Sequence, residues 1–552
     1  MPDYSDDEIH SHLRVNLRES GSVTPQVVAL TQDTINYNLK VLYHENQVFK
    51  KINISHGTTS IQAATKAGQI SIPTDNKAGH TVFYHCFFVS GTAKLPAQAG
   101  NNTVDVDLKN WEFVFPVDVG KIKMERGSSR DKVAKEMDRK GEFEILALFL
   151  DFTKNQISSY DRSMSKFPGH DLQPNQLQSF LGLMQEWAKS VSTPEAQNAA
   201  TFSYVLQTQK PQTVSPEAPM FPPPDLLNIQ TYPYMTPKTG QTEAGLTKAG
   251  ARNMLLFILG SNVVQYPAKS LQWMGNLVMD GIPGTICLSR EVMWDGFLLQ
   301  KQPAFLMNDV NFVMCGYFHA DKLTLDQGSN DYPKVDFGAS YGINDANRAK
   351  DGLIYGWQKS NDSVWNWSKA GNGSKQTPYS NKYWAGLDVE WRSSASMAHQ
   401  PSTNAVECSG TTEYFFQLRV TNNNMNQPRE YALAKMHITM KWTLIFQFLV
   451  HDNGILTVNV DFPQNKYSFD AKITEQKGFD LTQFKDDQSK KFEESRTKAL
   501  ERIQQECVPQ LKQDIARVHQ FTLPGHGTFL YKNPVWTDMG DLMVDVDYVQ
   551  GS

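Results

Sequence analysis

The sequence predicts an α+β fold in which strongly curved antiparallel sheets wrap around long amphipathic helices. Two observations support this prediction. Many apolar runs alternate apolar with polar residues, which gives a strand one dry face and one wet face and is typical of antiparallel sheet. One helical pattern near the C-terminus also covers residues 485–519, roughly 50 Å at 1.5 Å per residue. A helix of that length beside long strands favours a binding protein over an enzyme.

The chain has 552 residues, which is more than one compact core usually holds. We expect a β-rich module at residues 1–240 and a second module at residues 241–552, which contains the long helix. A stretch at residues 211–250 is rich in Pro, Thr, Gly and Gln and predicts an extended linker or surface strap between them.

Charge and cysteine content exclude some classes of protein. The net charge is only −5, which argues against nucleic-acid binding, since that needs clustered Lys and Arg. The five cysteines are scattered and are expected to be buried free thiols rather than disulfides or zinc ligands. The N-terminus resembles no signal peptide and no run is long enough to cross a membrane. The chain is therefore expected to be cytoplasmic, or released without a classical signal peptide.

Strands dominate the pattern along the chain, as runs rich in Val, Ile, Phe, Tyr and Trp. A hairpin is predicted where residues 437–450 lead through Asn453 and Gly454 into the next run, because Asn-Gly supplies the positive φ angles of a tight turn. The predicted strands are residues 81–89, 111–119, 142–152, 201–207, 253–259, 311–320, 386–392, 412–421, 437–450, 454–462, 527–532 and 541–549.

Helices are few. Residues 174–191 place Phe180, Met184 and Trp187 on one face, and Ser289 can cap a short helix that follows it. The long helix should be kinked at Pro509, since proline lacks the amide hydrogen that the helix needs. Its apolar stripe is Phe492, Ala499, Leu500, Ile503, Cys507, Val508, Leu511, Ile515 and Val518.

Two motifs carry possible chemistry. Gly338-Ala-Ser340-Tyr-Gly342 matches the G-x-S-x-G nucleophile elbow, but that elbow needs a buried strand before it and a helix after it. The flanking residues show neither, so a glycine-rich turn is favoured over a serine esterase at Ser340. No HExxH, P-loop, GxGxxG or EF-hand spacing is present. We therefore expect no catalytic residue, no metal and no cofactor.

A tryptophan-rich segment contains Trp357, Trp365 and Trp367 in a setting of Gly, Ser and Asn. Such residues can form a membrane-interface or sugar-stacking surface. Packing of the segment onto the sheet accounts for them equally well.

Three segments resemble a known family. Residues 110–119 (Asn-Trp-Glu-Phe-Val-Phe-Pro-Val-Asp-Val) are similar to an early strand of the tubular lipid-binding (TULIP) proteins, in particular the OrfX-like accessory proteins encoded beside clostridial neurotoxins. Residues 255–259 followed by 282–299 resemble that group's strand–helix step. The pattern Phe529-x4-Pro534-x-Trp536-x3-Gly540-Asp-Leu resembles its closing strands.

The resemblance implies a curved sheet around a long helix, a groove that holds lipid or another apolar small molecule, and no catalytic residues. It implies a role as a toxin-associated accessory protein, with a protein partner or peripheral membrane contact left open. The rival interpretation is a protein-interaction or structural module whose core is closed by side chains. The candidate groove residues are Phe492, Leu500, Ile503, Leu511, Ile515, Trp294 and Phe297.

Overall fold

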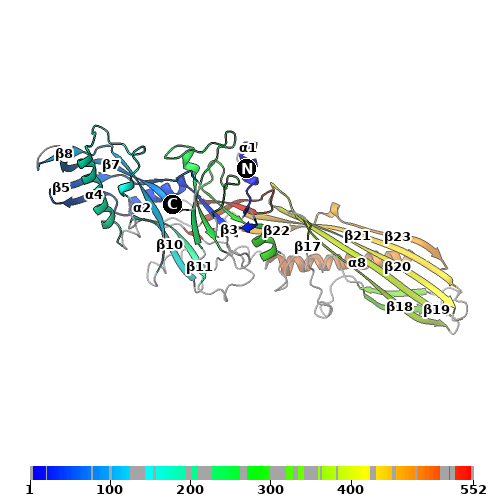
Figure 1. Cartoon of the computed structure of the whole chain (residues 1–552). Coiled ribbons are helices and arrows are strands. Elements are labelled where there is room, and N and C mark those ends of the chain that lie inside the picture. Colours follow the sequence, from blue (N-terminus) through cyan, green and yellow to red (C-terminus); the bar gives the residue numbers. More distant parts are fainter. Residues whose placement is uncertain are drawn as a thin grey trace. The chain divides into compact units, whose positions relative to one another are not determined.

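The computed structural model (Figure 1) describes most of the chain. The described residues are 4–19, 21–75, 79–97, 102–124, 143–152, 157–193, 200–208, 227–260, 270–298, 319–326, 334–340, 358–360, 364–380, 383–422, 430–450, 456–478, 482–509, 521–522 and 529–548. No helix within these ranges combines the length and the apolar character needed to span a membrane.

The chain folds into two compact units. Unit 1 comprises residues 1–293, 450–455 and 517–552, and unit 2 comprises residues 294–449 and 456–516. This division differs from the predicted boundary at residue 240. Strands β12 (Leu227–Tyr232) and β13 (Met254–Leu259) flank that position and pair with each other along their length. Part of the predicted strap is thus a strand, and both sides of residue 240 belong to one sheet.

The larger sheet of unit 1 runs in the order β24-β11-β10-β9-β7-β5-β4, with β6 and β8 also paired to β7. Helix α4 (Pro174–Ser190) confirms the helix predicted at 174–191, and it buries Phe180, Met184 and Trp187 as its apolar face required. The strands are β4 (Lys51–His56), β5 (Thr59–Thr65), β6 (Gln69–Ser71), β7 (Thr81–Pro96), β8 (Thr103–Asp107), β9 (Glu112–Lys123), β10 (Phe143–Asp151), β11 (Thr201–Thr208) and β24 (Phe521–Thr522).

The smaller sheet of unit 1 has the antiparallel order β12-β13-β3-β14-β26-β25. Its central strands are buried along their whole length, because apolar runs such as Met254–Leu259 have both faces covered. The remaining bounds are β3 (Gln26–Thr31), β14 (Gly284–Leu288), β25 (Phe529–Trp536) and β26 (Leu542–Tyr548). Short elements complete the unit: α1 (Asp6–Leu13), β1 (Arg18–Glu19), β2 (Ser22–Val23), α2 (Gln32–Glu45), η2 (Ile157–Ser159) and η4 (Gly250–Arg252).

The short helix predicted after Ser289 is the π-helix η5 (Glu291–Leu298). As expected of a cap, the Ser289 hydroxyl accepts a hydrogen bond from the amide of Val292 at 3.2 Å. Three of the predicted free thiols, Cys86, Cys287 and Cys408, are buried and unbonded.

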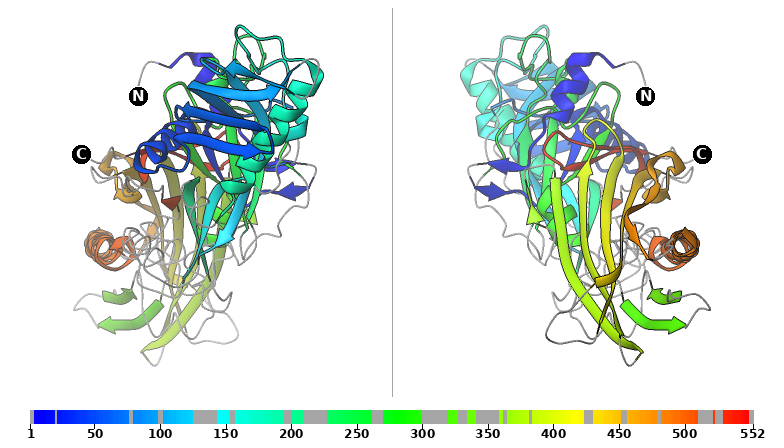
Figure 2. Two further views of the ribbon diagram at one scale, coloured as in Figure 1. Left: turned by 90° about the vertical axis from the view of Figure 1, so that its left-hand side faces the viewer. Right: turned by 90° about the vertical axis from the view of Figure 1, so that its right-hand side faces the viewer.

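Unit 2 is built on one long-stranded antiparallel sheet, in the order β17-β18-β19-β20-β21-β22, with β23 also paired to β21. It contains the predicted hairpin, formed by β21 and β22, whose turn lies outside the described residues. Figure 2 shows that this sheet bends rather than lying flat, as the sequence predicts. Its strands are β17 (Gln358–Lys359), β18 (Val364–Ser380), β19 (Tyr383–His399), β20 (Ala405–Asn422), β21 (Glu430–Val450), β22 (Leu456–Asp461) and β23 (Ser468–Lys477), with η6 (Gln464–Lys466) before β23. Strands β15 (His319–Asp326) and β16 (Lys334–Ser340) form a separate pair.

The two faces of this sheet differ sharply. Side chains alternate along β19, β20 and β21, and the register places most of the buried positions on one face. On that dry face Val389, Phe416, Met436 and Ile473 lie in one row across four strands. They belong to an apolar cluster whose buried members are each no more than 8% exposed. The opposite, wet face carries the polar partners that period two predicts.

The structure describes the long C-terminal helix from residue 482 to residue 509. Helix α8 spans Thr482–Arg502 and continues as the π-helix η7 (Ile503–Cys507). Residues 510–520 lie outside the described part of the chain. Helix α8 contacts β16 and β23 and runs beside the long strands of its unit (Figure 1). The association of helix and curved sheet is therefore confirmed, whereas the described part of α8 is mostly polar.

Candidate functional site

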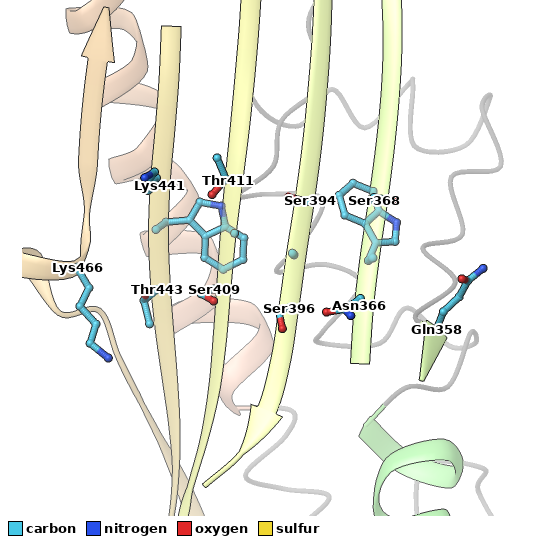
Figure 3. A pocket seen from close by; sticks show the side chains of 14 residues that line it. Gln358, Asn366, Ser368, Ser394, Ser396, Ser409, Thr411, Lys441, Thr443 and Lys466 are labelled. Carbon is cyan, nitrogen blue, oxygen red and sulfur yellow. The ribbon is translucent and has the colours of Figure 1, made fainter. Parts of the chain in front are cut away.

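Two polar rows cross the wet face of the unit 2 sheet, each with one side chain from β18, β19, β20 and β21. Pairing aligns Asn366 with Ser396, Ser409 and Thr443 in the first row. The second row lies two residues along each strand and contains Ser368, Ser394, Thr411 and Lys441. Figure 3 shows both rows running across the strands.

These two rows line a hollow of about 630 Å³, which we call the trough. Its floor is the row of residues between them, Trp367, Ala395, Gly410 and Trp442. The side chains of this middle row belong to the dry face, because neighbouring residues of a strand point to opposite sides. Seven of the eight polar side chains are short, so the wet face is hollow here.

The ends of the trough carry longer side chains. Gln358 on β17 lies at one end and Lys466 in η6 at the other (Figure 3). The Lys466 ammonium is 2.8 Å from a Glu407 carboxylate oxygen, which neutralises it. Among the described residues, no carboxylate lies within ion-pair distance of Lys441. The trough therefore holds one unpaired positive charge.

The polar side chains of the trough have unused hydrogen-bonding groups. In the part of the chain that the structure describes, none of the six Ser and Thr hydroxyls in the two rows bonds to another protein group. On the dry face, one residue further along β19 and β20, the Ser393 and Thr412 hydroxyls lie 2.7 Å apart and bond to each other. The trough hydroxyls are thus available to water or to a ligand.

The wet face continues beyond the trough into a charged cluster. The rings of Phe415 and His437 stack at 4.3 Å with an interplanar angle of 9°. His437 Nε2 lies 3.3 Å from a Glu413 carboxylate oxygen, and the Arg392 guanidinium lies 5.6 Å from the Phe415 ring centre. This cluster occupies rows adjacent to the trough on β19, β20 and β21.

The structure places Trp365 and Trp367 on the dry face, which agrees with the packing interpretation and not with a role at a membrane surface. Trp365 is 1% exposed and Trp367 is 7% exposed. Trp365 stacks on Trp294 with ring centres 4.1 Å apart, so Trp294 belongs to this packing and not to an open groove. Both Trp365 and Trp367 alternate with the polar residues of β18, and that alternation carries them to the buried side. Trp357 lies outside the described residues.

The predicted groove residues on the helix are only partly described. Ile503 is buried and Leu500 is half-buried. The side chains of Phe492 and Phe297 are not described, and Leu511 and Ile515 lie outside the described residues. The structure thus brings no apolar groove of these residues together in its described part.

Ser340 is the last residue of β16 and pairs with His319 in an antiparallel hairpin. A nucleophile elbow requires a strand that leads directly into a helix, and the residues that follow Ser340 lie outside the described part of the chain. Elsewhere in the described ranges, no group of three His, Cys, Asp or Glu side chains is placed to hold a metal ion.

A Ser-His-Glu arrangement in unit 1 was not predicted. Ser71 Oγ lies 2.8 Å from His85 Nε2, and His85 Nδ1 lies 2.8 Å from a Glu112 carboxylate oxygen. The other Glu112 oxygen accepts from the Lys166 ammonium at 2.9 Å. Burial lowers the pKa of His85 despite the adjacent carboxylate. Because Ser71 is only 1% exposed, this is a closed hydrogen-bond network that ties three strands together, and a substrate could not reach the serine.

Comparison with known proteins gives structural neighbours only. No family model matches the chain, and no curated protein matches it. Among solved structures, the chain is similar to P47 from Clostridium botulinum A2, with a TM-score of 0.46 and 11% identity over 95% of this chain and 97% of that one. P47 of Clostridium botulinum E1 follows, with a TM-score of 0.43 and 9% identity over 95% and 99%. A lipopolysaccharide binding protein has a TM-score of 0.30 and 11% identity over 96% and 100%.

Proposed function

We propose that this chain is a non-enzymatic binding protein for a lipid or other amphiphile, and that the polar part of the ligand lies in the trough of unit 2. The trough itself supports this proposal: it is a hollow of about 630 Å³ lined by side chains with unused donors and acceptors. A ligand that offers the complementary groups would replace water there with little loss of hydrogen bonding.

The proposal changes the expected ligand contact from apolar to polar. An acyl chain in the trough would leave the hydroxyls of both rows without partners, and each unpartnered polar group costs about 1–3 kcal/mol. The apolar part of the ligand must therefore lie outside the trough, where burying its methylenes contributes about 0.8 kcal/mol each. The accessory role beside a toxin stays a prediction of the sequence resemblance.

A second candidate function is a protein-interaction or structural module with a closed core. The dry face of unit 2 favours it, because the buried side chains of the apolar cluster are each no more than 8% exposed. A closed face of this kind cannot hold a lipid without rearranging.

Ligand recovery tests the proposal. Wild-type protein purified under native conditions is extracted with organic solvent and the extract is analysed by mass spectrometry. Ser409→Phe fills the trough from its first polar row, and Gln417→Phe places the same ring on the same strand and face outside it. We expect a bound lipid from wild type and Gln417→Phe, and a depleted one from Ser409→Phe with unchanged circular dichroism. Recovery of no lipid from wild type, together with no binding to liposomes, would refute the proposal.

A further inference from the structure

We infer that the group recognised by the trough is a linear, neutral, polyhydroxylated chain, that is, a glycan lying across the four strands. This inference rests on the proposed function and specifies the chemistry of its ligand. The glycan can be the head group of a lipid or a free oligosaccharide, because both present the same hydroxyls to the protein.

The hydrogen-bond donors and acceptors of the trough match those of a sugar. A Ser or Thr hydroxyl donates one hydrogen bond and accepts others, and an Asn or Gln amide offers both kinds of group. Six hydroxyls and the amides of Asn366 and Gln358 therefore make the trough both donor and acceptor. A sugar hydroxyl has the same double character. An ionised phosphate diester or carboxylate only accepts, so the acceptors that the trough offers would be unused.

The trough has too few positive charges for an anion site. Anion sites in proteins combine several cationic or backbone N–H donors. Here Glu407 neutralises Lys466, and it also accepts a hydrogen bond from Gln400 at 3.1 Å. Lys441 alone is unpaired among the described residues that line the trough. One exposed ammonium is a weak basis for anion selectivity, whereas it readily donates to a sugar oxygen.

The dimensions of the two rows match those of a linear glycan. Neighbouring strands lie about 4.8 Å apart, so each row extends about 14 Å from β18 to β21, and the two rows lie about 7 Å apart. A β-linked linear glycan is a flat ribbon with hydroxyls along both edges and a sugar repeat comparable to the strand spacing. Lying across the strands, such a ribbon meets the row of Asn366 along one edge and the row of Ser368 along the other.

Calorimetric titration with cello-oligosaccharides, from the disaccharide to the hexasaccharide, tests the inference on the full chain. We expect affinity to rise with chain length until the rows are covered, at about three sugars from the 14 Å extent, and then to level off. Ser409→Phe should weaken binding at least about tenfold, equivalent to 1.4 kcal/mol, and Gln417→Phe should not. Raised salt should have little effect, since neutral groups carry the contact.

Two further probes separate the sources and the failures. Dodecyl β-cellobioside carries the same β-linked disaccharide on an alkyl tail. If it binds much more tightly than cellobiose, the ligand is a lipid head group; equal affinity identifies a free glycan, which keeps the inference and removes the lipid of the proposed function. Inorganic phosphate is titrated into wild type and Lys441→Met. If phosphate binds to wild type but not to Lys441→Met, and neither the oligosaccharides nor the cellobioside binds, the glycan inference is overturned while the proposed function survives. Absence of oligosaccharide and cellobioside binding overturns the inference in any case.

Discussion

Replacing Gly410 with alanine should destabilise unit 2 by roughly 1–3 kcal/mol, the usual cost of adding atoms to a filled core. A Cβ at Gly410 would lie 2.3 Å from a ring carbon of Trp442, and further ring atoms lie at 2.4 and 2.7 Å. Trp442 is only 3% exposed, so its ring cannot move without disturbing its neighbours. Lys441 and Thr443, which flank Trp442 in the sequence, line the trough. Ligand binding should therefore weaken together with stability.

Gly373→Ala is the matched control. It lies on β18 of the same sheet, and an added Cβ there would meet no atom within 4 Å. Alanine loses less backbone entropy than glycine on folding, so its stability should be unchanged or slightly raised. Urea unfolding followed by circular dichroism compares the two variants with wild type. Equal midpoints for Gly410→Ala and Gly373→Ala would refute the packing of Trp442 over Gly410.

Three further predictions concern buried charge in unit 1. Burial raises the pKa of Asp545 to about 6 from 3.8, so the folded state holds this proton more tightly than the unfolded state. The free energy of unfolding should therefore fall by up to roughly 3 kcal/mol as pH rises through this range, and Asp545→Asn should remove that fall. Burial lowers the pKa of His12 to about 4 from 6.5, so the unfolded state takes up this proton more readily than the folded state. The free energy of unfolding should therefore fall by up to roughly 3 kcal/mol as pH drops through that range, and His12→Gln should remove that fall. Urea titrations between pH 4 and 7 measure both effects, and unchanged pH profiles would contradict them. Arg18→Met removes the guanidinium that lies 2.7 Å from the fully buried Asp541 carboxyl group, which should lower the free energy of unfolding by about 3–5 kcal/mol. Lys189→Met removes one partner of an exposed ion pair and should lower it by under about 1 kcal/mol. Equal losses of stability in the two variants would show that the buried pair is unimportant.

Local patterns in the sequence were enough to predict some of the elements, although α2, β3 and β18 were not among them. The apolar face of residues 174–191 is the buried face of α4. The alternation in residues 437–450 is the alternation of dry and wet faces along β21. Both signals depend on residues close in the chain, whose periodicity directly reports which side is covered.

The candidate site could not be predicted in the same way, because it depends on register between strands. Ser396 and Ser409 share a row only because β19 and β20 pair at those positions, and a shift of one residue would carry one of them to the dry face. For the same reason the sequence left two interpretations of Trp365 and Trp367 open, since their spacing of two places them on one face without showing whether that face is buried. His85 likewise meets Ser71 and Glu112 only through the pairing of separate strands.

The most direct test of the trough as the ligand site is an experimental structure of the chain with its natively bound or added ligand. The proposal predicts ligand density across β18, β19, β20 and β21, between the row of Asn366 and the row of Ser368, with hydroxyls in contact with both rows. A ligand seated elsewhere, with only water in the trough, would contradict it.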